Sequence, residues 1–203
     1  MAYNPFSLEG KTILITGASS GIGRATAIEC SKMGATLIIC GRNEKRLKET
    51  LNSLEGEGHT TFVGDLTEQD NIEGLVNSCS NVDGVVLSAG RGLTLPFNFS
   101  SREKFDEIFN INFFSPIELL RLLNKKKKIA NNGSVVTIVS IGGTGRYAVG
   151  NSIYGASKAA LNSMVHFCAQ ELSGRLIRVN GVCPGMVETT LIRRGTLTNA
   201  TLK

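Results

Sequence analysis

The sequence predicts an α/β fold, in which a doubly wound parallel sheet lies between two layers of helices. Short runs of apolar, largely β-branched residues alternate along the whole chain with longer stretches whose apolar residues recur at helical spacing. The apolar runs are continuous rather than alternating, which is typical of strands buried on both faces of a parallel sheet. Right-handed crossovers between such strands place helices on both faces, so three layers are expected.

The first half of the chain gives three strands and three helices in order. Residues 12–16 form a β-branched run between Gly10 and Gly17, which indicates a buried strand. Apolar residues then recur at helical spacing over 20–33 and stop at Gly34, a residue that commonly ends a helix. The next elements expected are a strand, a polar helix, a strand and a helix, over residues 35–40, 44–54, 59–63 and 67–79.

The second half continues the alternation. A strand is expected over 83–87, followed by a long amphipathic stretch over 101–123. Pro116 lies inside this stretch and should kink the helix or mark a step in it. The last elements expected are a strand, a strongly apolar helix and a strand, over residues 134–139, 154–172 and 178–182.

The length of 203 residues suits one domain, and we expect a single domain over residues 1–203. With 41% hydrophobic and 19% charged residues, the composition excludes collagen-like, low-complexity and acidic disordered chains. Much of the net charge of +5 lies in the run Lys125–Lys128. Because the excess positive charge is concentrated in this one run, we expect neither a nucleic-acid nor a membrane partner.

The cysteines indicate the compartment. The five cysteines are scattered, and none forms a C-x-x-C pair or lies near a histidine at metal-ligand spacing, so no metal site is expected. Cys30 and Cys40 fall in apolar segments and should be buried free thiols. The chain has no signal-like N-terminus and no apolar run approaching about 18 residues. We therefore expect a soluble protein of the reducing cytoplasm.

A glycine-rich turn follows the first strand directly. Its spacing is G-x-x-x-G-x-G, and it opens a helix. Glycines there permit a tight turn and close approach of a pyrophosphate, while the helix N-terminus offers free N–H groups to the anion. The candidate contacts are Gly17, Ser19, Ser20, Gly21, Ile22 and Gly23. The alternative is a structural loop without a ligand, which its position after a buried strand disfavours.

Arg42 predicts the choice of cofactor. An acidic residue at the end of the second strand would bind the ribose hydroxyls of NAD, but residues 40–43 contain no carboxylate. An arginine there can pair with a 2′-phosphate through charge-assisted contacts, and Arg24 adds a second candidate cation. We therefore expect NADP(H) rather than NAD(H). The alternative is that Arg42 is a solvated loop residue.

Over about residues 8–191 the sequence resembles the short-chain dehydrogenase/reductase family, some of whose members reduce 3-oxoacyl groups on acyl carrier protein. The motifs that carry this resemblance occur in the expected order: Thr16–Gly23, Asp65-Leu66, Ser88-Ala89-Gly90, Asn112, Ser140, Tyr154, Lys158 and Pro184-Gly185, with Val187 and Thr189 beyond. Ser88 stands where the family has asparagine. The resemblance implies a Rossmann-like fold, and it places Asp65 against the adenine.

The resemblance also assigns catalytic roles. Tyr154 and Lys158 are four residues apart, so they share one face of a helix. An isolated tyrosine, with a pKa of about 10, is a poor base near neutrality, and a nearby ammonium favours the phenolate. In the family the tyrosine exchanges a proton with the substrate oxygen, the serine orients that oxygen, and the lysine also holds the nicotinamide ribose. Asn112 would position a water in a proton relay. The reaction interconverts a carbonyl and a secondary alcohol.

Three other interpretations remain open. In the first, Tyr154 packs on the core and Lys158 is a solvated charge, which Ser140 and Asn112 in register argue against. In the second, the protein is a catalytically silent nucleotide-binding sensor or scaffold on the same fold. In the third, the lysine run binds nucleic acid, but no aromatic platform accompanies it.

The substrate is indicated only in outline. In the family, segments matching residues 91–99, 141–153 and 186 onward build the pocket. A small-molecule or acyl-thioester carbonyl compound is expected. An acidic carrier protein would dock on a basic rim, for which Lys125–Lys128, Arg175 and Arg178 are candidates. The alternative for the lysine run is a solvated helix end, which we favour.

The resemblance bears on length and assembly as well. Family members usually have a seventh strand and a closing helix that help to form the pocket and the subunit interface, and they form homodimers or homotetramers. The sixth strand would otherwise be an open sheet edge. We therefore expect the natural chain to continue past Lys203.

Overall fold

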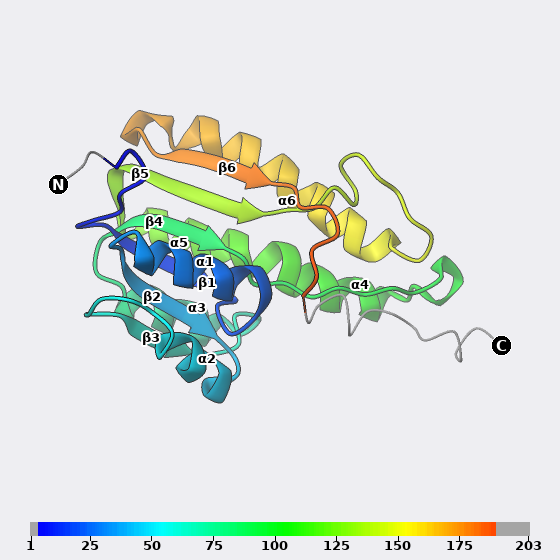
Figure 1. Ribbon diagram of the computed structural model, residues 1–203. Coiled ribbons are helices and arrows are strands. Elements are labelled where there is room, and N and C mark those ends of the chain that lie inside the picture. Colours follow the sequence, from blue (N-terminus) through cyan, green and yellow to red (C-terminus); the bar gives the residue numbers. More distant parts are fainter. Residues whose placement is uncertain (1–3, 190–203) are drawn as a thin grey trace.

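The computed structural model describes residues 4–189, which form one six-stranded parallel sheet between helices (Figure 1). The strand order across the sheet is β3-β2-β1-β4-β5-β6. The strands are β1 (Thr12–Thr16), β2 (Thr36–Gly41), β3 (Thr60–Val63), β4 (Val82–Leu87), β5 (Ile129–Ile138) and β6 (Arg178–Val182). Between β1 and β4 the strand order reverses, and open α/β sheets bind ligands beyond the carboxyl ends of the strands at such a point. The predicted fold class is confirmed.

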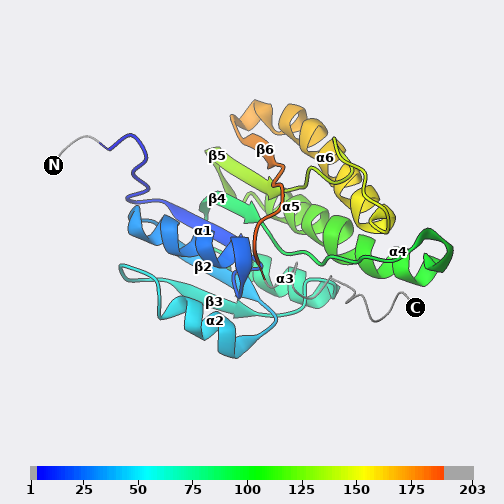
Figure 2. The same cartoon turned by 45° about the vertical axis from the view of Figure 1, so that its right-hand side comes forward.

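The helices cover both faces of the sheet (Figure 2). They are α1 (Gly21–Lys32), α2 (Glu44–Leu51), α3 (Gln69–Ser78), α4 (Arg102–Phe109), α5 (Ser115–Lys125) and α6 (Ser152–Glu171). Helices α1 and α2 pack on one face, whereas α3, α5 and α6 pack on the other. A helix is present at each predicted position with ends that differ by a few residues, except that the stretch over 101–123 is divided.

The apolar core is divided by the sheet into two clusters. Successive side chains of a strand point to opposite faces. Thus Ile13 and Ile15 of β1 pack with Ala27 of α1 on one side, while Leu14 packs with Leu119 of α5 on the other. This double burial explains why the central strands read as continuous apolar runs.

Burial on both faces does not hold at the sheet edges. Most residues of β3 and β6, the two edge strands, are exposed, including Val63 and Val182.

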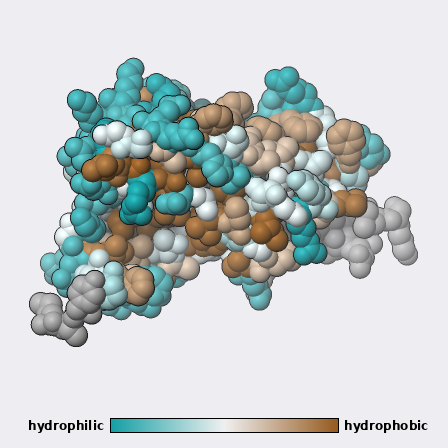
Figure 3. Space-filling model, turned by 90° about the horizontal axis from the view of Figure 1, so that it is seen from above, coloured by the Kyte–Doolittle hydropathy of each residue, from teal (hydrophilic) through white to brown (hydrophobic). Residues whose placement is uncertain are grey.

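Strand β5 begins earlier than expected, at Ile129, with an irregular stretch in which Asn132 has a left-handed φ of 64°. Figure 3 looks onto the α6 and β6 side of the molecule, where hydrophobic residues gather in the middle of the face between hydrophilic ones.

The long amphipathic stretch is three elements rather than one helix. A π-helical segment, Asn110–Phe114, separates α4 from α5. Pro116 lies just after this segment, in the first turn of α5. Because proline has no N–H, it cannot donate the usual bond to the carbonyl four residues earlier, that of Asn112. The predicted step is therefore present, and it falls on the asparagine that the sequence motif singled out.

The lysine run ends α5 at the amino ends of the strands. Lys128 Nζ donates to the Cys79 carbonyl at 2.6 Å, and Lys126 Nζ donates to Asn77 Oδ1 at 2.7 Å. Both acceptors lie at the C-terminus of α3, where cations are favoured by the helix dipole. Arg175 likewise bonds to Asn124 and to the Ile129 carbonyl. The helix-end interpretation of this run therefore has structural support.

The cysteines differ in burial. Cys40 is buried, and burial raises the pKa of its thiol to about 12. Cys30 is only half-buried, so the prediction that it is buried was wrong, and Cys183 is exposed.

Over residues 4–189, no helix is long and apolar enough to cross a bilayer. The expectation about the end of the chain concerns residues outside the described ones.

Candidate active site

The motif residues meet at the carboxyl ends of the parallel strands. The loops after β1, β4, β5 and β6 all emerge there, on the right-hand side of the sheet in Figure 1. This is the end at which open α/β sheets bind ligands. The site is therefore assembled from segments that are far apart in the sequence.

The glycine-rich turn packs directly on the loop that follows β4. Gly17 has a left-handed φ of +69°, and a Cβ placed there would lie 2.8 Å from the Ala89 backbone, so no larger residue fits. Thr16 Oγ1 accepts hydrogen bonds from the backbone N–H groups of Ser88 at 3.1 Å and Ala89 at 3.2 Å. These contacts hold the two loops together as one surface.

The N-terminus of α1 is available to an anion. Its N-cap, Ser20, makes no side-chain cap, and the first turn contains no acidic residue. In contrast, Asn43 caps α2 and Ser101 caps α4. The first-turn N–H groups of α1, together with its dipole, therefore suit a phosphate. Ser19 lies beside the end of β2, because a Cβ on Gly41 would lie 3.1 Å from its Cβ.

The segment after β6 returns to this turn. A Cβ on Gly21 would lie 3.4 Å from the Thr189 side chain. Nearer β6, Ile141 N donates to the Pro184 carbonyl at 3.2 Å, and the Ile141 side chain lies 3.8 Å from a Cβ built on Gly185. Val187, between these contacts, is exposed. The segment thus connects the loop after β5 with the glycine-rich turn.

Arg42 and Asp65 form an ion pair beyond β2 and β3. Arg42 Nη1 lies 3.1 Å from Asp65 Oδ2, while Asp65 Oδ1 accepts from both the N–H and the hydroxyl of Thr67. Partial burial acts to raise the pKa of Asp65, but the bonds from Thr67 and Arg42 outweigh it and lower the pKa. The carboxylate is therefore ionised and fixed in position.

Leu66 connects this end of the site to a cleft. Leu66 is only 4% exposed and lines a cleft of about 290 Å³ between α3 and the α4–α5 junction. The other lining residues are Thr67, Gln69, Ile72, Asn110, Phe114, Ser115, Ile117 and Glu118. The cleft thus lies next to the position at which adenine is expected.

Ser140 and Tyr154 lie on either side of Gly142. A Cβ on Gly142 would lie 3.3 Å from Ser140 Oγ and 3.9 Å from Tyr154 Cε1, so the two side chains approach the same point. The loop between them is pressed onto the start of α6, because a Cβ on Gly143 would lie only 2.1 Å from the Gly155 carbonyl oxygen. This packing fixes Ser140 relative to Tyr154.

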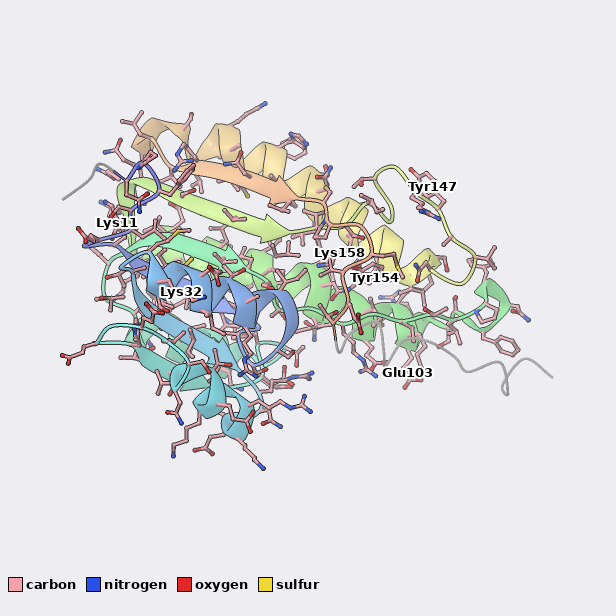
Figure 4. All side chains as sticks on the ribbon, in the orientation of Figure 1. Lys11, Lys32, Glu103, Tyr147, Tyr154 and Lys158 are labelled. Atoms are coloured by element: carbon pink, nitrogen blue, oxygen red, sulfur yellow. The ribbon has the colours of Figure 1, made fainter. Side chains whose placement is uncertain are left out.

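Lys158 is buried in the same site. It projects from α6 one turn after Tyr154 (Figure 4), is 5% exposed, and donates from Nζ to the Ile138 carbonyl at 2.8 Å. Burial lowers the pKa of its ammonium from 10.5 to about 8. A Cβ on Gly90 would lie 3.5 Å from this Nζ. The predicted motifs after β4 and on α6 therefore face each other.

Asn112 is fully buried and holds the loop after β4. Its Oδ1 accepts from Arg91 N at 2.8 Å, and its Nδ2 donates to Arg91 O at 2.9 Å and to Ser157 Oγ at 3.1 Å. The Arg91 side chain also pairs with Glu107 of α4. The side chain of Asn112 therefore acts on backbone and on Ser157, and both of its amide hydrogens are used.

The four predicted catalytic residues, Asn112, Ser140, Tyr154 and Lys158, lie in one region of the structure. Two further residues that the sequence argument did not use support it. Thr16 opens the glycine-rich motif and Ser157 lies between Tyr154 and Lys158, and both are buried hydroxyl residues with partners in another loop or helix. A buried hydroxyl must find such a partner, which is the signal that points to them.

The suggested basic rim lies elsewhere. Lys125–Lys128 and Arg175 are at the amino ends of the strands, and β4 spans six residues between them and the site. At about 3.3 Å per residue this separates the rim from the loop after β5 by roughly 20 Å. A carrier protein docked on that rim would not face Tyr154.

Over residues 4–189, no group of three or more His, Cys, Asp or Glu side chains is placed to hold a metal ion.

Comparison with known proteins identifies relatives of this chain. The short chain dehydrogenase family model matches residues 11–199. A tropinone reductase homolog of Arabidopsis thaliana is 34% identical over 193 residues, which are 92% of this chain and 71% of the relative.

Two solved structures show the same fold. One is a 3-ketoacyl-(acyl-carrier-protein) reductase from Brucella melitensis complexed with NADH, with a TM-score of 0.84 and 28% identity over 92% of this chain and 80% of that chain. The other is the Pseudomonas aeruginosa RhlG/NADP active-site complex, with a TM-score of 0.87 and 26% identity over 95% and 79%. Given the matched family model and a relative of this identity and coverage, the chain belongs to the short-chain dehydrogenase family of oxidoreductases.

Proposed function

We propose that the protein is an NADP(H)-dependent oxidoreductase that interconverts a carbonyl group and a secondary alcohol. The observation that carries this proposal is that Tyr154, Lys158 and Ser140 converge beside the glycine-rich turn. The ammonium of Lys158 is buried there and bonded to the Ile138 carbonyl. The uncapped N-terminus of α1 and the glycine cradle fit a dinucleotide. The bound cofactor would supply or accept the hydride.

Each residue then has a task that its surroundings support. Tyr154 would exchange a proton with the substrate oxygen, and Ser140 Oγ would hold that oxygen in place. Lys158 has one N–H bonded to Ile138 and two more to direct at Tyr154 and the nicotinamide ribose. Asn112, with Gly90 and Arg91, would hold the wall of the pocket beside the ribose.

The residues at the other end would bind the adenosine half. Arg42 would pair with the 2′-phosphate of NADP(H), and Asp65 and Leu66 would border the adenine. The remaining contacts would come from Gly17, Ser19, Ser20, Gly21, Ile22 and Gly23, from Ser88, Ala89 and Gly90, and from Pro184, Gly185, Val187 and Thr189. The structural neighbours include one complex with NADH and one with NADP, so the choice between them rests on Arg42.

The substrate would be a small-molecule carbonyl compound or a 3-oxoacyl thioester. The relatives include tropinone reductase homologs and a 3-ketoacyl-(acyl-carrier-protein) reductase. An acidic carrier would have to approach from the carboxyl ends of the strands. We further propose a cytoplasmic location and a homodimeric or homotetrameric assembly. The second candidate function, a silent nucleotide sensor, is favoured only by the replacement of asparagine by Ser88.

The test is NADPH oxidation with a panel of ketones and 3-oxoacyl thioesters. Wild-type protein should turn over at least one of them, and Tyr154→Phe should lose turnover while keeping its affinity for NADPH. Circular dichroism of the variant would establish that it is folded. Full activity in Tyr154→Phe would refute the mechanism, and NADPH binding without any turnover by the wild type would favour the sensor.

A further inference from the structure

A chain of buried hydrogen bonds joins the loop after β4 to the helix that carries Tyr154. Asn112 Nδ2 donates to Ser157 Oγ at 3.1 Å, and Ser157 Oγ donates to the Tyr154 carbonyl at 2.7 Å. Asn112 and Ser157 are both 0% exposed. Water therefore cannot replace the bond between them, and each partner depends on the other.

The orientation of the Asn112 amide follows from these partners. A carbonyl oxygen only accepts hydrogen bonds, so the Ser157 hydroxyl must donate its hydrogen to Tyr154 O and accept a hydrogen bond from Asn112. Nitrogen Nδ2 therefore faces Ser157, and Oδ1 is left to accept from Arg91 N at 2.8 Å. The opposite orientation would set Oδ1 against Ser157, where no hydrogen is available, and a donor against Arg91 N–H.

This orientation matters because of what the amide holds. Gly90, just before Arg91, lies between Asn112 and the ammonium of Lys158: a Cβ on Gly90 would lie 3.1 Å from Asn112 Oδ1 and 3.5 Å from Lys158 Nζ. The π-helical segment presents Asn112 at this point. The Gly90–Arg91 backbone beside Lys158 is thus held by a side chain that Ser157 orients together with Arg91 itself.

We propose that Ser157 is a positioning residue that sets the Asn112 amide and so fixes the Gly90–Arg91 backbone against the Tyr154–Lys158 helix. Ser157 does not touch the reacting atoms in this assignment, and it acts through Asn112. The proposal rests on the proposed function, because its consequence is measured in cofactor affinity and turnover.

A double-mutant cycle tests this assignment. Ser157→Ala leaves a buried N–H of Asn112 without an acceptor, so kcat/KM should fall roughly ten-fold or more. In the Asn112→Ala background the same change should cost less than about two-fold, because the partner is already gone. Equal losses in both backgrounds would overturn the proposal and indicate ordinary helix packing.

Two further measurements keep the result interpretable. Ser157→Thr, which retains the hydroxyl, should recover activity relative to Ser157→Ala where it folds, and Ser163→Ala on the same helix is the control for serine loss. The same double-mutant cycle is also measured with the dissociation constant of NADPH, which is determined from NADPH fluorescence. If the wild type binds NADPH but has no turnover, the proposed function fails while this binding cycle still decides the role of Ser157.

Discussion

Arg42 and Asp65 are ion-paired across the ends of β2 and β3, with Nη1 3.1 Å from Oδ2. The sequence had assigned them separately, one to a 2′-phosphate and the other to the adenine. The pairing means that the carboxylate competes with a phosphate for the same guanidinium. Both side chains are partly exposed, so the pair itself adds little stability and is available for exchange.

The first prediction concerns Arg42. Arg42→Gln should raise KM for NADPH by roughly 10- to 100-fold and change KM for NADH by less than about three-fold, because only NADPH carries the 2′-phosphate. Steady-state kinetics with both cofactors would measure this. Arg102→Gln, which removes another exposed arginine from an ion pair, should leave the ratio unchanged. An equal rise in KM for both cofactors would show that Arg42 does not bind the 2′-phosphate.

Asp65→Asn gives the complementary result. Any contact with the adenine is common to the two cofactors, so its loss affects them equally. Releasing Arg42 from the carboxylate should lower KM for NADPH relative to KM for NADH. A ratio that stays constant would contradict the competition inferred from the ion pair.

The second prediction concerns Thr16. Thr16→Val keeps the shape of the side chain but removes the acceptor of the Ser88 and Ala89 N–H groups. The free energy of unfolding should fall by about 1–3 kcal/mol, and affinity for NADPH should fall with it. Urea unfolding and NADPH titration would measure the two effects. Thr12→Val, at the other end of β1, is the matched control and should be close to wild type.

The third prediction concerns Gly143. Its φ of +90° and the 2.1 Å approach of a built Cβ to the Gly155 carbonyl oxygen exclude a side chain. Gly143→Ala should lower the free energy of unfolding by about 1–3 kcal/mol and reduce turnover by displacing Ser140 from Tyr154. Gly145→Ala, where nothing lies within 4 Å of the built Cβ, should show no such change in thermal unfolding.

The fourth prediction is the pH dependence of stability due to Lys158. Burial lowers the pKa of this ammonium to about 8, whereas the unfolded value is about 10.4. The folded state therefore binds the proton more weakly, so burial opposes folding below pH 8 and this cost fades as the pH rises from 8 to 10.4. Wild type should become more stable relative to Lys158→Met over that range.

Urea unfolding at pH 7.5 and pH 10 would measure this difference. The control variant is Lys48→Met, which removes an exposed lysine from α2. A pH-independent difference for Lys158→Met would mean that the ammonium is not held in a desolvated position.

Much of the architecture was predictable because it is encoded locally. The β-branched run before Gly17 and the helical spacing after it determine β1 and α1, and the motif order brings Tyr154, Lys158 and Ser140 together. The edge strands were less predictable, since the exposure of Val63 and Val182 depends on which strands have a neighbour.

Other features depend on tertiary contacts that the sequence does not display. Pro116 indicated a step, but the π-helical form of that step is seen only in the backbone that presents Asn112 to Arg91 and Ser157. Similarly, Lys125–Lys128 reads as a basic patch in sequence, and only the fold shows that it caps α3 at the far end of the sheet.

The bond between Thr16 and Ser88 also bears on how the protein folds. These residues are 72 positions apart, and the parallel pairing of β1 with β4 closes the same long loop. Closing such a loop costs chain entropy before any contact repays it, which makes parallel pairing slow. Affinity for NADPH should therefore return after helical structure during refolding. Recovery of NADPH binding would then report that β1 and β4 have paired and that the central sheet is complete.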